Sequence, residues 1–237
     1  MNYQYEVTIS QDKFKSIPYL RDLLACIEPI PYSSCGSFLS ALLFKRNFQN
    51  SFDVLVEDET LVYDAVKGMC DIDRKKGTMT FSDVDGILLM KIKIYDSISK
   101  YSDIRKYVLE NTSTETCFIT STNNDVDKLI LKIPKRGTAL MQMFIELDEN
   151  DDQMIVEIME KTVWSLSKIG VATLLRDIRF MPQALIDIAA DKIEDMMVEH
   201  ANKTVSLMRM HGTVLFKTIT SSELKKFGKP FAALLKA

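Results

Sequence analysis

The chain has 237 residues, of which 46% are hydrophobic and 27% charged, and its formal net charge is -3. This composition is typical of a soluble globular protein. A nucleic-acid-binding domain usually has a basic excess, so the slightly acidic balance argues against a nucleic-acid partner. No apolar run approaches the ~20 residues that span a bilayer, and residues 1–10 are polar and aromatic, unlike a signal peptide. We therefore expect a cytoplasmic protein. Because no low-complexity linker interrupts the chain, we expect one domain over residues 1–237.

The residues that most often bind metals are scattered along the sequence. The two histidines, His200 and His211, would need further ligands to form a metal site, so the favoured interpretation is a polar helix residue and an unrelated loop histidine. The acidic run from Asp148 to Asp152 lacks the spacing and the glycine of a calcium loop. Neither a metal nor a cofactor is therefore expected. The cysteines form no Cys-x-x-Cys pair and are expected to be reduced and mostly buried. They are Cys26, Cys35, Cys70 and Cys117.

The first fifty residues predict one strand and two helices. Tyr3 to Ile9 alternates between apolar or aromatic and polar residues, which is typical of a short strand. Ser10 is placed to cap a helix that continues to Ile27. A second, strongly apolar helix is predicted from Ser37 to Phe48.

A β-rich segment follows, indicated by the period-two alternation of its apolar residues. Its clearest strand is Ile87 to Tyr95, whose even-numbered residues are apolar and are expected to face one way, with Lys91 and Lys93 facing the other. A short helix is predicted from Ser99 to Glu110. The other predicted strands cover residues 52–56, 61–65, 79–81, 117–122, 129–133, 141–147 and 154–163.

A long amphipathic helix is predicted from Phe180 to Met210. Pro182 suits its first turn, where the missing N–H would have had no partner. Apolar residues recur at helical spacing and form one stripe, so the helix needs a broad apolar surface to lie on. The tail from Gly212 to Ala237 contains a predicted strand over residues 213–219 and apolar patches that suit a docking surface.

Two stretches of the sequence resemble START-like lipid-transfer domains, which have the helix-grip architecture. Phe52 to Glu59, followed by Leu61-Val62-Tyr63, is similar to the family's opening segment into its first strand. Arg136-Gly137, the two hairpin strands and Met181 to Ile186 are similar to the family's approach to its final helix. The resemblance implies an α+β fold in which a curved antiparallel sheet wraps a long C-terminal helix. It would make residues 1–51 a helical extension, 52–210 the sheet with its gripped helix, and 211–237 a C-terminal tail.

The resemblance also implies a function. In START-like domains a lipid lies between the sheet and the final helix, so we expect non-enzymatic binding, or transfer between membranes, of a lipid or another apolar molecule, with transient membrane contact. Methionine side chains would line such a cavity, since they adapt to apolar ligands. Lys132, Lys135 and Arg136 form either an exposed strand end or a contact for an anionic headgroup at the cavity mouth. The predicted ligand-binding residues are Met90, Ile92, Arg136, Met141, Met143, Val156, Ile158, Leu185, Ile186, Ala189, Ile193, Met196 and Met197.

Two other functions stay open. The tail from Gly212 has no counterpart in START-like domains, which favours an interaction or structural protein, such as an assembly subunit or a viral component that docks on partners through the tail. An enzyme is the least favoured hypothesis, because no constellation of acid, base and nucleophile can be read from the sequence.

Overall fold

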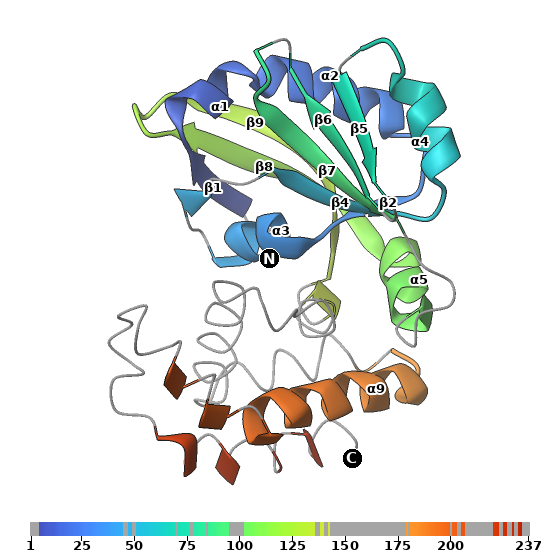
Figure 1. The fold of residues 1–237 in the computed structure, drawn as a ribbon, viewed down its shortest axis with the longest axis vertical. Helices are drawn as coiled ribbons and strands as arrows, with labels where there is room; N and C mark the ends of the chain where they lie inside the picture. The colour runs from blue at the N-terminus through green and yellow to red at the C-terminus, as the bar shows by residue number, and fades with distance from the viewer. Residues whose placement is uncertain are drawn as a thin grey trace. The chain divides into compact units, whose positions relative to one another are not determined.

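In the computed structural model, the chain divides into two compact units, Met1–Lys135 and Arg136–Ala237. The first unit contains two β-sheets and the helices α1 to α5 (Figure 1). The α+β class predicted from the sequence is therefore confirmed. The structure describes residues 5–44, 47–48, 51–69, 71–75, 78–83, 85–94, 102–135, 138–139, 142, 179, 181–199, 201–202, 205–206, 220–222, 225–226, 229 and 232–233.

Sheet A is a mixed sheet built from segments far apart in the sequence. Its strands, in spatial order, are β3 (Asn47–Phe48), β1 (Tyr5–Ile9), β8 (Thr112–Ser121) and β9 (Val126–Pro134). β1 runs parallel to both of its neighbours, whereas β8 and β9 form an antiparallel hairpin. One face is buried, as the apolar residues Val7, Cys117 and Leu131 are each at most 1% exposed.

Sheet B is also mixed. Its strands, in spatial order, are β2 (Tyr32–Ser34), β4 (Phe52–Val56), β7 (Leu88–Ile94), β6 (Thr78–Ser82) and β5 (Asp71–Lys75). β4 runs parallel to β7, and the other neighbouring pairs are antiparallel. An antiparallel sheet was expected, and that prediction is wrong for β4–β7 and for both partners of β1. Parallel neighbours need long crossover connections, which α3, α4 and the intervening strands supply here.

The helices of the first unit pack against these sheets. They are α1 (Gln11–Lys15), α2 (Ile17–Ile27), α3 (Gly36–Phe44), α4 (Glu59–Val66) and α5 (Ser102–Glu110). The helix predicted from Ser10 to Ile27 is divided at Ser16 into α1 and α2. The second of these carries a buried stripe, in which Ile17, Leu20, Leu23 and Ile27 are at most 1% exposed. These residues recur every three or four positions, which is the period of one helix face. The helix predicted from Ser37 ends at Phe44, before β3.

The strand predicted over residues 61–65 is wrong, because this segment belongs to α4. The Asp58 carboxylate accepts hydrogen bonds from the amides of Thr60 and Leu61, at 2.8 and 3.3 Å, and so caps the helix. Val62 and Val66 are four residues apart and are both buried, while Leu61 is 53% exposed. The informative pattern was therefore the helical spacing of the two valines.

The strand predicted at residues 87–95 is confirmed as β7, with one correction to its faces. Met90 and Ile92 are fully buried, as expected, but Leu88 is 37% exposed. The register of β6 and β7 shifts between Phe81 and Ser82, which pair with Met90 and Leu88. An extra residue at such a bulge reorients the side chains beyond it, so Leu88 does not continue the buried row.

In the second unit, α9 (Gln183–Glu194) continues into the π-helical turn η1 (Asp195–Glu199). This confirms the predicted long helix over residues 183–199, with Pro182 at its start. Leu185, Ile186 and Met197 are buried. In the part of the chain that the structure describes, no helix could cross a bilayer. The predicted strand over residues 213–219 lies outside the described residues, as does the predicted hairpin over residues 141–163 apart from Gln142. Gln142 is helical, so the strand prediction is wrong at that residue.

Burial of a cysteine thiol in the first unit predicts that the free energy of unfolding falls at alkaline pH. Burial raises the pKa of the Cys117 thiol on β8 to about 12, from an ordinary value of 9.0. A group whose folded pKa is raised stabilises the fold below its unfolded pKa and loses that contribution as the pH rises toward the folded value. Cys117 should therefore lower the free energy of unfolding by up to about 1.4 kcal/mol per pH unit from pH 9 toward pH 12.

Urea unfolding of the wild type and of Cys117→Ala, followed between about pH 8 and pH 11, tests this expectation. The free energy of unfolding should fall more steeply with pH in the wild type than in the variant. Tyr32, whose pKa burial also raises to about 12, is present in both proteins, so the difference between the two slopes reports Cys117 together with its smaller effect on the Tyr32 pKa. Equal slopes would contradict the prediction.

Candidate functional site

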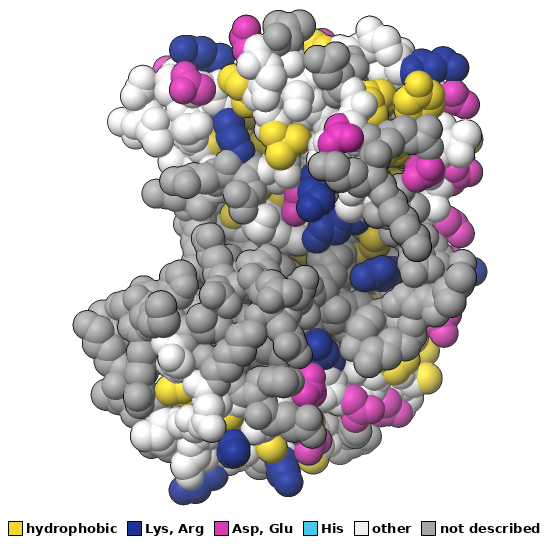
Figure 2. All heavy atoms as spheres, viewed as in Figure 1, with side chains coloured by type: hydrophobic (Ala, Val, Ile, Leu, Met, Phe, Trp, Pro, Cys, Tyr) yellow, Lys and Arg dark blue, Asp and Glu magenta, His cyan; other side chains and the backbone are white. Residues whose placement is uncertain are grey.

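Charged side chains gather on one face of the β4–β7 pair. The parallel register pairs Asp53 with Lys91 and Leu55 with Lys93, so these side chains project from the same face of sheet B. The opposite face carries Val54 and other fully buried apolar residues. Figure 2 shows lysine and arginine side chains over this part of the sheet. One face of this strand pair is therefore wholly apolar, whereas the other combines the charged residues Asp53, Lys91 and Lys93 with the buried Leu55.

Asp53 is a carboxylate on an otherwise apolar buried strand and is only 6% exposed. Burying a charge is costly unless polar partners surround it. The Ser51 hydroxyl donates a hydrogen bond to Asp53 Oδ1 at 2.9 Å. The Cys35 amide donates to the Asp53 backbone carbonyl at 3.0 Å. This second bond ties β4 to the residue that immediately precedes α3.

The amino end of α3 approaches the same carboxylate very closely. Gly36 has a φ of 59°, in the left-handed region that favours glycine. A Cβ at this position would lie 2.5 Å from Asp53 Oδ2 and 2.9 Å from Lys93 Nζ. Only a residue without a side chain therefore fits here, and the backbone of α3 meets one negative and one positive side chain. The next residue, Ser37, is half-buried.

Lys13 of α1 adds a third ammonium group. Its side chain is half-buried, and its Nζ lies 5.7 Å from the centre of the Phe48 ring. Burial lowers the pKa of Lys13, and the negative charge of Asp53 counteracts part of that shift. Lys13 is therefore within electrostatic range of the Asp53 carboxylate. We call Lys13, Lys91, Lys93 and Asp53 the lysine cluster.

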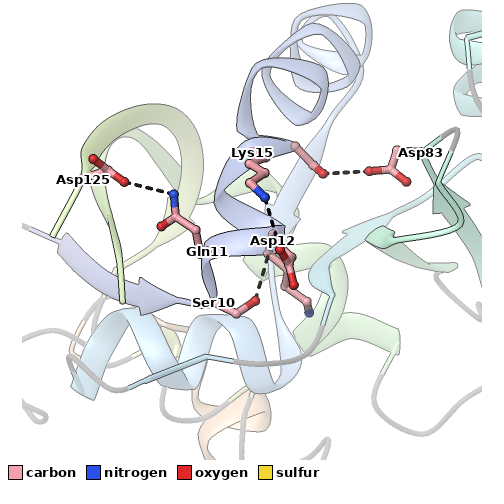
Figure 3. A network of polar contacts seen from close by, with 8 residues as sticks. Ser10, Gln11, Asp12, Lys15, Asp83 and Asp125 are labelled. Atoms are coloured by element: carbon pink, nitrogen blue, oxygen red, sulfur yellow. Dashed lines mark hydrogen bonds and ion pairs between the residues drawn. The ribbon is translucent and has the colours of Figure 1, made fainter. Parts of the chain in front are cut away.

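Polar contacts fix α1 and so position Lys13 (Figure 3). Gln11 Nε2 donates to Asp125 Oδ2 at 3.0 Å, which ties the start of α1 to the β8–β9 turn. The Ser16 hydroxyl donates to Asp83 Oδ2 at 2.7 Å, which ties its end to the β6–β7 turn. Both ends of this short helix are thus anchored to strands, and the Lys13 backbone is held in place.

The lysine cluster has the chemistry of an anion site. Three ammonium groups outnumber one carboxylate, and the amino end of α3 contributes a further partial positive charge. Among the described residues no group of three or more His, Cys, Asp or Glu side chains could hold a metal ion. The groups that could bind a ligand here are therefore amines, backbone amides and hydroxyls.

The residues predicted to bind a ligand fall in different parts of the chain. Met90 and Ile92 lie in the apolar core face of sheet B, not on its polar face. Leu185, Ile186 and Met197 are buried in the second unit. The backbone of Ala189, Ile193 and Met196 belongs to α9 or η1. Outside the described residues lie Arg136, Met141, Met143, Val156 and Ile158.

Sequence reasoning missed Lys13, Gly36, Asp53 and Lys93 as site residues. Two local signals could have drawn attention to them. One is a glycine followed by serine at the start of an apolar helix, where backbone amides are exposed to an anion. The other is a single aspartate inside the apolar run Phe52–Val56, because a charge on a buried strand needs polar partners.

No protein-family model matches the sequence, and the comparison with curated proteins found no match. Among solved structures, the chain is similar to the crystal structure of JHP933 from Helicobacter pylori, with 11% sequence identity and a TM-score of 0.43. The similarity covers 96% of this chain and 93% of that chain.

Proposed function

We propose that this chain binds a phosphate-bearing small molecule at the lysine cluster. The observation that carries the proposal is the convergence of Lys93 and Asp53 on the amino end of α3, where a Cβ at Gly36 would lie 2.9 Å from Lys93 Nζ. Backbone amides at a helix amino end and lysine ammonium groups are the usual donors to phosphate oxygens.

Charge matching favours a phosphate over a singly charged anion. Lys13, Lys91 and Lys93 carry three positive charges and Asp53 carries one negative charge, which leaves a surplus of two. A phosphate monoester carries about −1.5 to −2 charges at neutral pH. Such a group would add charge-assisted hydrogen bonds to these ammonium groups.

The same residues support binding over catalysis. General acid–base chemistry needs a titratable group near the operating pH, most often histidine. The sequence has histidine only at positions 200 and 211, and neither belongs to the first unit. Within the cluster only Asp53 is a carboxylate. It is buried beside lysines, so its negative charge serves to balance theirs. We therefore propose a non-enzymatic role, in the cytoplasm.

The phosphate could belong to a soluble ester or to a phospholipid headgroup. The second source agrees with the lipid-binding function that the START-like resemblance implies. The resemblance also implies a curved sheet that wraps the long C-terminal helix around a lipid. That finer arrangement is a separate proposal, because Met90 lies on the opposite face of sheet B from the lysine cluster. The amphipathic character of α9 supports this finer proposal, since its buried stripe includes Leu185 and Ile186. Docking through residues 211–237 remains the alternative function.

Calorimetric titration with ATP, as a soluble phosphate ester, tests the proposal directly. Lys93→Gln and Lys13→Gln are each expected to weaken ATP binding by about tenfold or more, because a charge-assisted hydrogen bond contributes about 1.5–3 kcal/mol. Lys106→Gln, at an exposed position on α5, is the matched control and should leave the affinity unchanged. Thermal unfolding monitored by circular dichroism verifies that each variant is folded.

Vesicles distinguish the two sources of phosphate. Sedimentation with vesicles that contain phosphatidic acid would identify a headgroup, with pure phosphatidylcholine vesicles as the neutral reference. Loss of vesicle binding in Lys93→Gln, without any ATP binding in the wild type, would assign the site to lipid. If neither ATP nor phosphatidic acid binds, or if folded Lys13→Gln and Lys93→Gln bind as tightly as the wild type, the proposal is wrong.

A further inference from the structure

A groove lies between α2 and β9, away from the lysine cluster. It has a volume of about 510 Å3, and both elements contribute its walls. Pockets that bind small organic molecules usually have volumes of about 300–1,000 Å3 and mostly apolar walls with a few polar groups. This groove therefore has the size of a ligand site within the first unit.

Polar contacts bridge α2 and β9 near both ends of the groove. Arg21 donates to both carboxylate oxygens of Asp127, at 2.7 and 2.6 Å. Lys132 Nζ donates to the carbonyls of Glu28 and Ile30, at 2.6 and 3.2 Å. These carbonyls belong to the end of α2 and the residues just after it. The two bridges fix the distance between helix and strand, so the groove is formed before any ligand enters.

The walls between the bridges are apolar. Leu24 and Leu129 lie at the buried side of the groove and are 5% and 1% exposed. The Tyr32 ring is 2% exposed and lies 4.9 Å from Lys132 Nζ. Ile130 forms an outer wall and is 63% exposed, which is unusual for isoleucine. Ala25 of α2, which is also exposed, lines the same groove.

The charges around the groove favour an anion. Arg21, Lys128 and Lys132 line it together with Glu28 and Asp127, which leaves one surplus positive charge. Lys128 and Glu28 are both exposed, and Asp127 is already bridged to Arg21. A ligand with one negative charge would match this surplus, whereas a cation would add to it.

We propose that this groove binds an amphipathic monoanion, a molecule with an apolar body and one carboxylate or sulfonate group. The apolar body would lie along Leu24, Leu129 and Ile130, and the anionic group would lie beside Lys128. This site shares no residue with the lysine cluster, so it does not depend on the function proposed there.

Fluorescence titration with anilinonaphthalene sulfonate, followed by displacement with dodecanoate, tests the proposal on the full chain. Ala25→Phe would fill the groove and is expected to weaken dodecanoate binding by about tenfold or more. Asp22→Phe adds the same ring to the same helix at an exposed position outside the groove. This variant should not weaken dodecanoate binding. Because it removes the negative charge of Asp22, its electrostatic effect would favour an anionic ligand.

The charge requirement has its own comparison. Dodecylammonium has the same apolar body with the opposite charge and should bind at least about tenfold more weakly than dodecanoate. Lys128→Glu should weaken dodecanoate binding, whereas Lys106→Glu on α5 should not. Lys93→Gln should leave dodecanoate binding unchanged, which separates this site from the lysine cluster. Equal affinities of the wild type and Ala25→Phe, or of the two ligands, would overturn the proposal.

Discussion

Gly36→Ala is expected to lower the free energy of unfolding by about 3 kcal/mol. A left-handed backbone conformation costs an ordinary residue about 1–2 kcal/mol, and φ at Gly36 is 59°. The new methyl group would also lie 2.5 Å from Asp53 Oδ2, a separation that real Cβ atoms do not tolerate. Displacing a buried side chain in this way adds about 1–3 kcal/mol. Urea unfolding at neutral pH measures the total.

Two other glycines provide matched controls for this substitution. Gly68 and Gly86 also have positive φ values, of 86° and 76°, but a Cβ at either position would meet no atom within 4 Å. Gly68→Ala and Gly86→Ala should therefore show the conformational cost alone, about 1–2 kcal/mol. If all three variants lose the same free energy, the close approach of Asp53 and Lys93 to α3 has no energetic consequence. Gly36→Ala should also weaken ATP binding, because Asp53 and Lys93 would have to move.

Phe38→Ala is expected to have a comparable or larger effect, a loss of about 3–5 kcal/mol. Phe38 on α3 is fully buried, and its ring centre lies 4.5 Å from that of Phe52 on β4 and 5.4 Å from that of Phe48 on β3. The three rings are mutually tilted, an arrangement that aromatic pairs prefer. Truncation would leave a cavity between α3 and both sheets, which the surrounding backbone cannot close.

Phe38→Leu is the appropriate comparison for this cavity. It retains much of the side-chain volume and should cost less than half as much as Phe38→Ala, about 1.5 kcal/mol. Chemical denaturation of both variants gives the two free energies. A loss below about 1 kcal/mol for Phe38→Ala would mean that the aromatic cluster does not hold α3 on the sheets.

Local periodicity allowed part of the fold to be predicted. The strand at Tyr5–Ile9, the helix at Ile17–Ile27 and the strand at Leu88–Ile94 each repeat one pattern over enough residues to be recognised. The segment Glu59–Val66 was assigned wrongly, because alternating Leu61 and Tyr63 obscured the helical spacing of its two valines. Strand direction could not be predicted, since an apolar strand has the same pattern in parallel and antiparallel sheets.

The candidate site could not be predicted because its parts are ordinary when considered one at a time. Lys13, Gly36, Asp53 and Lys93 come from four elements, and only the parallel register of β4 and β7 brings the last two to one face. The groove could not be predicted for the same reason, because its walls come from α2 and β9, which are about a hundred residues apart in sequence.

The position of β1 in the middle of sheet A has a consequence for synthesis of the protein. Thr8 pairs with Asn47 on one side and with Thr120 on the other. At translation rates of about 5–20 residues per second, the nascent chain carries this first strand for roughly ten seconds before its long-range neighbour emerges. Pairings so distant in sequence also slow folding, because the loop entropy is lost before the contact forms. Truncated chains that end before Thr112 should therefore depend on chaperones.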